Sequence, residues 1–492
     1  MAVEPTNNHR AVAIPTAPAG WEEIKPGTWY RGLDAMERLL YFYEHIDPNL
    51  AQWNVAIGIK LPAGVQYSVE EVKTAWMSLR MENPVIACTI EDHGRGIQYQ
   101  VPTENELVEW AEETVHIDTS GRTAREMTTY GKLPKSSTLH FFPHLRELSI
   151  HARHELLDGV GLLLCGNKFL KQLRVGSTSK HTIGEEIALL PSPTVDILGG
   201  NESLSPQMIE KAKRIAENYC DPNAIGLKTR SGGIQNVVPT LPEGLVEHQF
   251  TESDSAAILK ACRANKITLT TAIWAAQAKT ALKHGGGTSG NLATFVPVNL
   301  RSQVQTSATS TEINNTINLA FSHLPVDENS DFIEWAKGAQ NDLSFWRNGK
   351  ESMGVFRSVC EALEEKVNKD SKTGVTYPAR FFLTNVGISD NYIADPVEDV
   401  WLNIMVATPS SGGLIVLTTK GRIRMTACYN RAFFDEGQIE SYMEMVVSYL
   451  EKGLGLKFSD GDSLRPSIES KESISTSQRQ QATTQAFPAP QQ

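Results

Sequence analysis

The residues with the greatest chemical potential in this chain lie in the stretch LRELSIHARHELLDGVGLLLCG, at 145–166. An apolar strand pattern meets an apolar helix pattern there, and the corner between them carries His151, Arg153, His154 and Asp158. Polar groups in such a place cost free energy unless they are paired. An imidazole with a pKa near about 6.5 accepts a proton at neutral pH. The corner could therefore hold a general base, a metal site or a purely structural cluster.

Strand alternation places His154 in phase with the apolar, buried positions of its strand and Arg153 on the opposite face. Asp158 stands at the start of the following helix, where a carboxylate is favoured. Gly159 beside it permits close packing or an unusual backbone conformation. Taken singly, Asp158 is only a helix cap and His154 a satisfied core histidine, the more common role of an isolated histidine. The combination of these residues is what favours chemistry.

Other chemical motifs are not supported by their context. His151 and His154 are three residues apart on a strand and point to opposite faces, with Arg153 between them, so we predict no metal site. GGGTSG at 285–290 satisfies GxGxxG, but it follows a helix pattern and precedes a strand pattern, the reverse of the dinucleotide fingerprint. The absence of a Walker A motif and of a GxSxG elbow removes the usual signals of nucleotide triphosphatases and α/β-hydrolases.

Composition narrows the partners and the compartment. The chain has 492 residues and a formal net charge of −11, which argues against nucleic acid or an anionic membrane as the main partner. Its six cysteines have no short regular spacing, a pattern typical of free thiols in a reducing compartment. The N-terminal residues lack a signal-peptide pattern, and no apolar run approaches the roughly 20 residues of a membrane helix. We expect a cytoplasmic protein without membrane insertion.

Strand and helix patterns alternate in two comparable blocks, which predicts an α/β fold of two layered domains. Strands are expected at 53–62, 85–90, 96–101, 137–142, 145–152, 245–250, 292–301, 380–389, 400–410, 413–421 and 422–430. Helices are expected at 33–46, 68–84, 160–174, 205–220, 251–266, 268–284, 331–349, 355–367 and 435–453. The proposed boundaries are a flexible arm at 1–20, an N-terminal domain at 21–195, a linker with a helix at 196–243, a C-terminal domain at 244–457 and a Ser/Gln/Thr/Pro-rich disordered tail at 458–492.

The sequence HELLDG at 154–159 matches the HxxxDG signature of the CoA-dependent acyltransferase superfamily. This superfamily includes chloramphenicol acetyltransferase, the plant BAHD acyltransferases, the condensation domains of peptide synthetases and fungal O-acetyltransferases. The motif ends a strand and starts an apolar helix about a third of the way along the chain, as in that superfamily. TLTTAIWAAQAKTAL with FVPVNLRS, FLTNVGIS, and MTACYNRAFFDEGQIESYMEMVVSYL resemble further segments of it, so the resemblance covers both halves.

The resemblance implies two chloramphenicol-acetyltransferase-like domains with a solvent channel between them. His154 would lie in the middle of this channel as the general base, reached by the acyl donor from one side and the acceptor from the other. Asp158 would be structural and pair with Arg301 of the PVNLR segment across the domains. An arginine on an apolar strand does need a carboxylate partner. The alternative is that Arg301 ends its strand in solvent, as most arginines do.

The resemblance also implies a role for the FLTNVGIS segment. Asn385, with Thr384 beside it, is a candidate to stabilise the oxyanion or to bind substrate. An asparagine at the end of a strand is more often a turn residue, so both roles stay open at this point.

The chain departs from some branches of the superfamily. Arg153 stands where many members have the first histidine of HHxxxDG, and the plant DFGWG motif is missing. The closest resemblance is to free-standing fungal O-acetyltransferases of the trichothecene O-acetyltransferase type. It implies a monomer without a bound cofactor that moves an acyl group, most simply from acetyl-CoA, to a hydroxyl of a terpenoid or polyketide. Two alternatives remain: amide or ester formation from a carrier-protein thioester, and a binding protein without activity.

Overall fold

The computed structural model describes residues 17–44, 54–91, 94–128, 135–176, 181–198, 203–229, 243–304, 313–405, 411–431 and 433–459. Its strands are β1 (Glu22–Lys25), β2 (Thr28–Gly32), β3 (Asn54–Lys60), β4 (Thr89–Ile90), β5 (Gly96–Gln100), β6 (Val115–Ile117), β7 (Thr138–Phe142), β8 (Glu147–Arg153), β9 (Glu243–Gln249), β10 (Ser289–Asn299), β11 (Ile317–Asp327), β12 (Arg380–Ile388), β13 (Asp399–Ile404), β14 (Ser411–Thr419) and β15 (Arg422–Asn430). Its helices are α1 (Ala35–Glu44), α2 (Val69–Glu82), α3 (Glu104–Thr114), α4 (Ala124–Thr128), α5 (Gly159–Val175), α6 (Thr194–Ile197), α7 (Pro206–Tyr219), α8 (Glu252–Ala264), α9 (Leu269–Gly285), α10 (Phe332–Trp346), α11 (Gly349–Thr373) and α12 (Glu436–Leu454).

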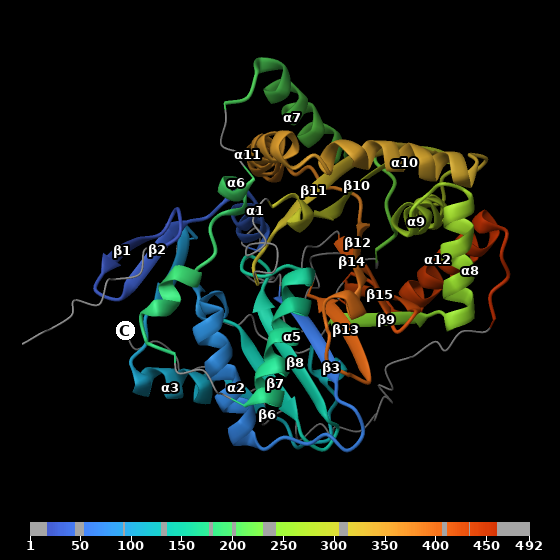
Figure 1. Cartoon of the computed structure of the whole chain (residues 1–492). Helices are drawn as coiled ribbons and strands as arrows, with labels where there is room; N and C mark the ends of the chain where they lie inside the picture. Colours follow the sequence, from blue (N-terminus) through green and yellow to red (C-terminus); the bar gives the residue numbers. More distant parts are fainter. Residues whose placement is uncertain are drawn as a thin grey trace, which may run out of the picture.

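The first half is built on a five-stranded sheet in the order β13-β3-β8-β7-β6. β3, β8 and β7 pair antiparallel, whereas β7 and β6 pair parallel. Helices α2 and α5 pack against each other, and α5 lies on β3 (Figure 1). Every residue of β8 except Arg153 is buried. The strand that leads to His154 is therefore covered on both faces, which fixes its direction.

Local sequence signals explain where the helices of this half begin. Ser68 and Glu71 form a reciprocal capping box at the start of α2. Asp158 begins α5 by accepting the backbone N–H of Gly161 at 2.7 Å. The apolar stripe of α5 faces the core as its helical spacing indicates. The stripe consists of Leu162, Cys165, Phe169 and Leu173, all buried.

The second half contains the sheet β12-β14-β15-β9 and the two-stranded ribbon β10-β11. β12 pairs parallel with β14, and the other pairs in this half are antiparallel. Helix α9 packs against α12 and β12 and is buried over most of its length, in keeping with its apolar sequence. Phe295 of β10 stacks on Phe382 of β12 with ring centroids 4.8 Å apart. The ribbon and the sheet thus share one core, with α7, α10 and α11 packed on β11 (Figure 1).

One strand from the second half of the sequence lies in the sheet of the first half. β13 pairs antiparallel with β3, from Asp399 opposite Lys60 to Ile404 opposite Val55. The apolar pattern at 400–410 predicts a strand there, but not its partner, because the pattern reports which faces are buried and not which neighbour is paired. The second half of the chain therefore contributes one strand to the sheet of the first half, and Figure 1 shows β13 beside β3.

The structure corrects the strand predicted at 85–90. Pro84–Ala87 form a 3₁₀ helix, and only Thr89–Ile90 form a strand. Pro84 at the first helical position has a backbone angle suited to a helical turn, which outweighs the strand preference of Val and Ile. The glycine run at 285–290 behaves as expected. Gly286 ends α9 with φ of 78°, and a strand follows.

Parts of the proposed domain scheme fall outside the described residues, which begin at 17 and end at 459. These parts are most of the arm at 1–20 and nearly all of the tail at 458–492. The helix expected in the linker is present as α7. The boundaries themselves remain proposals. Among the described residues, no helix is both long and apolar enough to cross a bilayer.

Candidate active site

His154 lies in the turn between the end of β8 at Arg153 and the start of α5 at Gly159. Its side chain is half-buried. Burial lowers the pKa of His154 below its usual 6.5, and nearby backbone groups and the charges of Asp158 and Glu155 oppose this shift only in part. The imidazole is therefore neutral at pH 7 and able to accept a proton.

Asp158 is 1% exposed, and both of its oxygens are occupied. Oδ1 accepts the N–H of Gly161 at 2.7 Å, which caps α5. Oδ2 accepts the N–H of Thr316 at 2.7 Å and Nη1 of Arg301 at 2.8 Å. Thr316 and Arg301 belong to the second half of the sequence. The carboxylate thus joins the two halves at the corner that carries His154.

The pair between Asp158 and Arg301 expected from the sequence is present. β10 ends at Asn299, and Arg301 lies in the short 3₁₀ helix Arg301–Gln303 that follows it. The Arg301 side chain is 5% exposed, and its Nη2 donates to the carbonyl of Asn314 at 2.7 Å. The alternative, that Arg301 ends its strand in solvent, is wrong. The guanidinium is buried and donates to the Asp158 carboxylate and to the Asn314 carbonyl.

Two glycines bring the N-terminus of α5 close to the second half. A Cβ placed on Gly161 would lie 2.5 Å from the carbonyl oxygen of Asn314, well inside van der Waals contact. A Cβ on Gly159 would lie 3.2 Å from Cγ2 of Val386 in β12. Close packing is therefore the role of Gly159, as expected, and the constraint on Gly161 is tighter still.

The backbone around His154 is held from outside its own segment. Nδ2 of Asn315 donates to the carbonyl of His154 at 2.8 Å. The hydroxyl of Thr194 donates to the carbonyl of Asn315 at 2.6 Å. These contacts hold the main chain of the turn that carries the imidazole.

Arg153, which stands in place of the first histidine of HHxxxDG, pairs with Glu155 across the turn. Nη2 of Arg153 donates to Oε1 of Glu155 at 2.8 Å. The Glu155 side chain is fully buried, and that of Arg153 is 12% exposed. A buried carboxylate needs such a partner, so the departure at Arg153 is matched by a compensating charge two residues later.

Asn385 lies in β12 at a bulge in the pairing with β14. Its Oδ1 accepts the N–H of Gly387 at 3.0 Å, and its Nδ2 donates to the hydroxyl of Thr270 at 3.0 Å. Gly387 has φ of 100°, which favours glycine. Asn385 thus does form a local turn contact, and the next residue, Val386, packs near Gly159. Thr384 is half-buried in the same strand, in register with Ile415.

Three imidazoles lie side by side on the neighbouring strands β8, β7 and β6. Nε2 of His151 is 2.9 Å from the hydroxyl of Ser149, and Nδ1 is 3.4 Å from Nδ2 of Asn54. The His151 ring lies 4.5 Å from that of His140, which lies 4.7 Å from that of His116. Burial lowers the pKa of His151 to about 4 and that of His140 to about 2. His151 is therefore a structural member of a polar layer, on the face of the strand opposite to the apolar one.

The chain is similar to known acyltransferases. Residues 243–390 match a family model described as the C-terminus of phthiocerol/phthiodiolone dimycocerosyl transferase. The sequence is 21% identical to O-acetyltransferase pigM of Monascus ruber over 93% of this chain and 92% of that protein. These matches support the resemblance of the chain to the CoA-dependent acyltransferase superfamily. The predicted recognition and the assignment as an acyltransferase enzyme are thereby confirmed.

Solved structures with the same fold support this acyltransferase architecture. TRI3 trichothecene 15-O-acetyltransferase from Fusarium sporotrichioides has a TM-score of 0.71 and 16% identity, covering 89% of this chain and 98% of that one. The EpoB cyclization-docking bidomain from Sorangium cellulosum has a TM-score of 0.62 and 12% identity, covering 87% and 86%. Likeness at such identities shows the fold, and it confirms the predicted α/β architecture of two chloramphenicol-acetyltransferase-like units.

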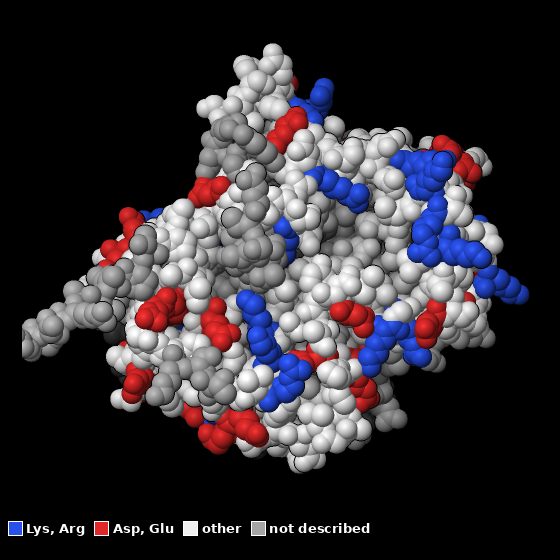
Figure 2. All heavy atoms as spheres, in the orientation of Figure 1, with Lys and Arg blue, Asp and Glu red and all other residues white. Residues whose placement is uncertain are grey.

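The acyltransferase has a pocket of about 350 Å³ in its second half. Its lining is Thr270, Val296, Pro297, Val298, Asn299, Ser302, Gln303, Leu343, Arg347 and Asn385. Two of these residues connect it to the corner described above: Oδ1 of Asn299 accepts the N–H of Arg301 at 3.0 Å, and Asn385 is adjacent to Val386. Figure 2 shows one face of the molecule, which is hollowed near its centre and has Lys and Arg side chains above and to the right of the hollow.

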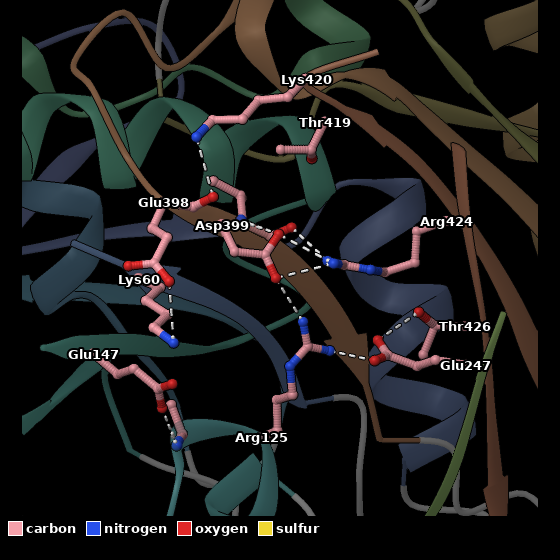
Figure 3. Close-up of polar contacts among 12 residues, drawn as sticks. Lys60, Arg125, Glu147, Glu247, Glu398, Asp399, Thr419, Lys420, Arg424 and Thr426 are labelled. Atoms are coloured by element: carbon pink, nitrogen blue, oxygen red, sulfur yellow. Dashed lines mark hydrogen bonds and ion pairs between the residues drawn. The ribbon is translucent and has the colours of Figure 1, made fainter. Parts of the chain in front are cut away.

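A second connection between the halves centres on Arg125 of α4 (Figure 3). Its guanidinium pairs with Glu247 of β9 and, at 2.9 Å, with Asp399 of β13. Asp399 also accepts from Arg424 of β15 at 2.9 Å. The Arg125 guanidinium lies 4.3 Å from the ring centroid of Trp401. This network of ion pairs links β13, a strand of the first sheet, to β9 and β15 of the second sheet.

Several residues of the acyltransferase site have no signal in the sequence. Asn314, Asn315 and Thr316 supply a carbonyl, an amide and a backbone N–H to the corner, yet NNT matches no motif. Thr270 has only the helical pattern of its segment. Their roles depend on where the chain passes in space, so only an observed fold could reveal them.

Proposed function

We propose that this acyltransferase moves an acetyl group from acetyl-CoA to a hydroxyl of a small-molecule secondary metabolite, with His154 as the general base. The observation that carries the proposal is the corner itself. A neutral imidazole sits in a turn whose backbone is held by Asn315 and whose end is fastened across the halves by Asp158 and Arg301. Such rigid positioning is what general-base catalysis requires.

The proposed reaction is a direct transfer. His154 takes the proton of the acceptor hydroxyl as its oxygen attacks the thioester carbonyl. The tetrahedral intermediate collapses, the carbon–sulfur bond breaks, and the departing thiolate receives the proton from the imidazolium. The products are the acetyl ester and free CoA. Asp158 and Arg301 keep their charges throughout, because each is occupied by the other and by backbone groups.

Asn385 is the proposed donor to the oxyanion. One N–H of its Nδ2 is donated to Thr270, and its Oδ1 is held by Gly387, which leaves the second N–H of Nδ2 for a ligand. The pocket that Asn385 lines is the proposed place of a cosubstrate beside the corner. Thr384 does not line this pocket, and its proposed role in binding substrate rests on its place beside Asn385 in the sequence. No covalent intermediate and no bound cofactor are needed, and acetyl-CoA acts as cosubstrate.

The names of related proteins support the acceptor class. One relative is called an O-acetyltransferase, and one structural neighbour is a trichothecene 15-O-acetyltransferase. These names motivate a hydroxylated polyketide or terpenoid as the acceptor here. We further propose a cytoplasmic monomer, which fits the negative net charge of −11 and a motif, HxxxD, that works in free-standing enzymes.

The second candidate function is amide or ester formation from a carrier-protein thioester. The likeness to a cyclization-docking bidomain of a nonribosomal peptide synthetase favours it. The higher TM-score of the free-standing acetyltransferase and the related O-acetyltransferase favour acetyl-CoA.

The test is release of free thiol from acetyl-CoA in the presence of a panel of hydroxylated polyketides and terpenoids. We expect turnover by the wild type and a loss of about 10²–10⁴-fold in His154→Ala. His248→Ala, which removes a half-buried histidine of β9 far from the corner in sequence and structure, is the control and should keep its activity. Turnover that survives His154→Ala in a folded protein would overturn the mechanism. Thiol release by neither protein would favour a carrier-bound donor or a binding role.

A further inference from the structure

The pocket of the second half has a mixed lining. Its apolar residues are Val296, Pro297, Val298 and Leu343. Its residues with amide or hydroxyl groups are Thr270, Asn299, Ser302, Gln303 and Asn385. A mixed wall of this kind suits a ligand arm that carries both methyl or methylene groups and amides. Among the described residues of the lining, Arg347 is the one with an ionisable side chain.

Two residues of the pocket lining, Asn299 and Asn385, are linked to the segments that hold the catalytic corner. Asn299 holds the backbone of Arg301, which pairs with Asp158. On the other side, Val386 follows Asn385 and contacts the start of α5 at Gly159. The lining of the pocket therefore includes Arg347 as well as residues that are linked to the segments holding the corner.

Arg347 stands at the end of α10 with an exposed side chain. Its guanidinium makes no ion pair or hydrogen bond with any residue in the described part of the chain, whereas its backbone is clamped by Gln303. Nε2 of Gln303 donates to the carbonyl of Arg347, and Oε1 accepts the N–H of Gly349 at 2.8 Å. The backbone at Arg347 is thus held in place by Gln303, while the Arg347 guanidinium has no ion-pair partner among the described residues.

An uncommitted guanidinium at a pocket of a chain with a net charge of −11 is suited to an anion, and to phosphate above all. We infer that Arg347 binds a phosphate of the CoA donor and that Gln303 positions it, so that the enzyme selects acetyl-CoA over donors that lack phosphate. This inference rests on the proposed function for the identity of the donor. It adds which residue recognises that donor, and through which of its groups.

The experiment compares the dissociation constants of CoA and of pantetheine, which lacks the phosphates, for the wild type and Arg347→Gln by calorimetry under reducing conditions. An exposed ion pair to phosphate should be worth about 5-fold in affinity. We therefore expect CoA to bind Arg347→Gln about 5-fold more weakly, with pantetheine unchanged. The difference for CoA should shrink as salt is raised from 0.05 M to 0.5 M, because salt screens exposed charges.

Arg214→Gln is the matched control, since it removes an exposed arginine from α7 without touching the pocket lining. Gln303→Ala should weaken the binding of CoA, as Arg347→Gln does. The double variant should bind CoA no more weakly than Arg347→Gln alone. Equal weakening of CoA and pantetheine, or unchanged binding of both, would overturn the inference. Binding needs no acceptor, so a chain that binds CoA through Arg347 but releases no thiol would refute the proposed function alone.

Discussion

His154 and Asp158 are four residues apart, and the structure gives them different surroundings. The side chain of His154 is half-buried, and this burial lowers its pKa so that the imidazole is neutral at pH 7. Asp158 is almost fully buried and receives two backbone N–H groups and a guanidinium. A group that must gain and lose a proton is thus kept apart from a group that must hold its charge. Within one motif, His154 is thus the proposed catalytic base and Asp158 links the two halves of the chain.

The attachment can be measured with a double-mutant cycle on Asp158 and Arg301. Removing either partner leaves the other as a buried, unpaired charge, so Asp158→Ala and Arg301→Ala should each lower the free energy of unfolding by about 3–5 kcal/mol. The double variant should lose clearly less than the sum, because the second removal relieves the first. Urea denaturation of the four proteins gives these values. Strictly additive losses would show that the pair is not coupled.

At the scale of elements, the N-terminus of α5 is the part of the fold with the least tolerance. The helix begins at a cap that also reaches the second half, and its first turn packs on the backbone of Asn314. The approach is possible only because Gly161 has no side chain. Bulk added to this turn would push α5, and with it the corner, away from the second half.

This intolerance predicts opposite effects for two Gly→Ala substitutions in helices. Gly161→Ala places a methyl 2.5 Å from a backbone oxygen, so it should destabilise the protein by about 1–3 kcal/mol and reduce activity with it. Gly338→Ala in α10 meets no atom within 4 Å and should stabilise by about 0.5–1 kcal/mol. Thermal melting and thiol release report both. A neutral Gly161→Ala would mean that the two halves can move apart without cost.

The elements were largely predictable from the sequence, and the partners of those elements were not. Periodicity and caps placed α2, α5, α9 and α12 within a few residues of their observed bounds. They do so because amphipathic spacing and capping are local. The partner of β13 is set by a contact between distant segments, which no local pattern records.

The same contrast holds for the candidate site. The HxxxDG match predicted the pair of Asp158 with Arg301, because the residues at both ends belong to recognisable segments. It could not predict Asn314, Asn315 and Thr316, which act mainly through backbone groups or through contacts to backbone groups. Any residue type supplies a carbonyl or an N–H, so such roles leave no trace in residue identity.

At the scale of the whole molecule, buried histidines make the protein sensitive to acid. Burial lowers the pKa of His140 to about 2 and that of His151 to about 4. The unfolded chain binds protons on these side chains near pH 6.5, whereas the folded chain resists them until much lower pH. A folded pKa below the unfolded one means that stability is complete above about pH 6.5 and falls as the pH drops.

We therefore expect the free energy of unfolding to fall steeply between pH 6.5 and pH 4. Each strongly shifted histidine costs about 1.4 kcal/mol per pH unit in this range, so His140 and His151 together remove about 4 kcal/mol by pH 5. Urea denaturation at several pH values measures the slope, and His140→Gln should make it shallower. Equal stability at pH 7 and pH 5 would contradict the burial of these rings.

The pairing of β13 with β3 affects how the chain folds while it is being synthesised. β3 is complete near the start of the chain, but its edge partner β13 follows about 340 residues later. At a ribosomal rate of about 5–20 residues per second, that edge stays open for roughly 20–70 s. An unpaired strand edge exposed for so long can pair with another nascent chain. The yield of active protein should therefore depend on chaperones and on translation speed more than its final stability suggests, and separate expression of the two halves should give a first half that aggregates.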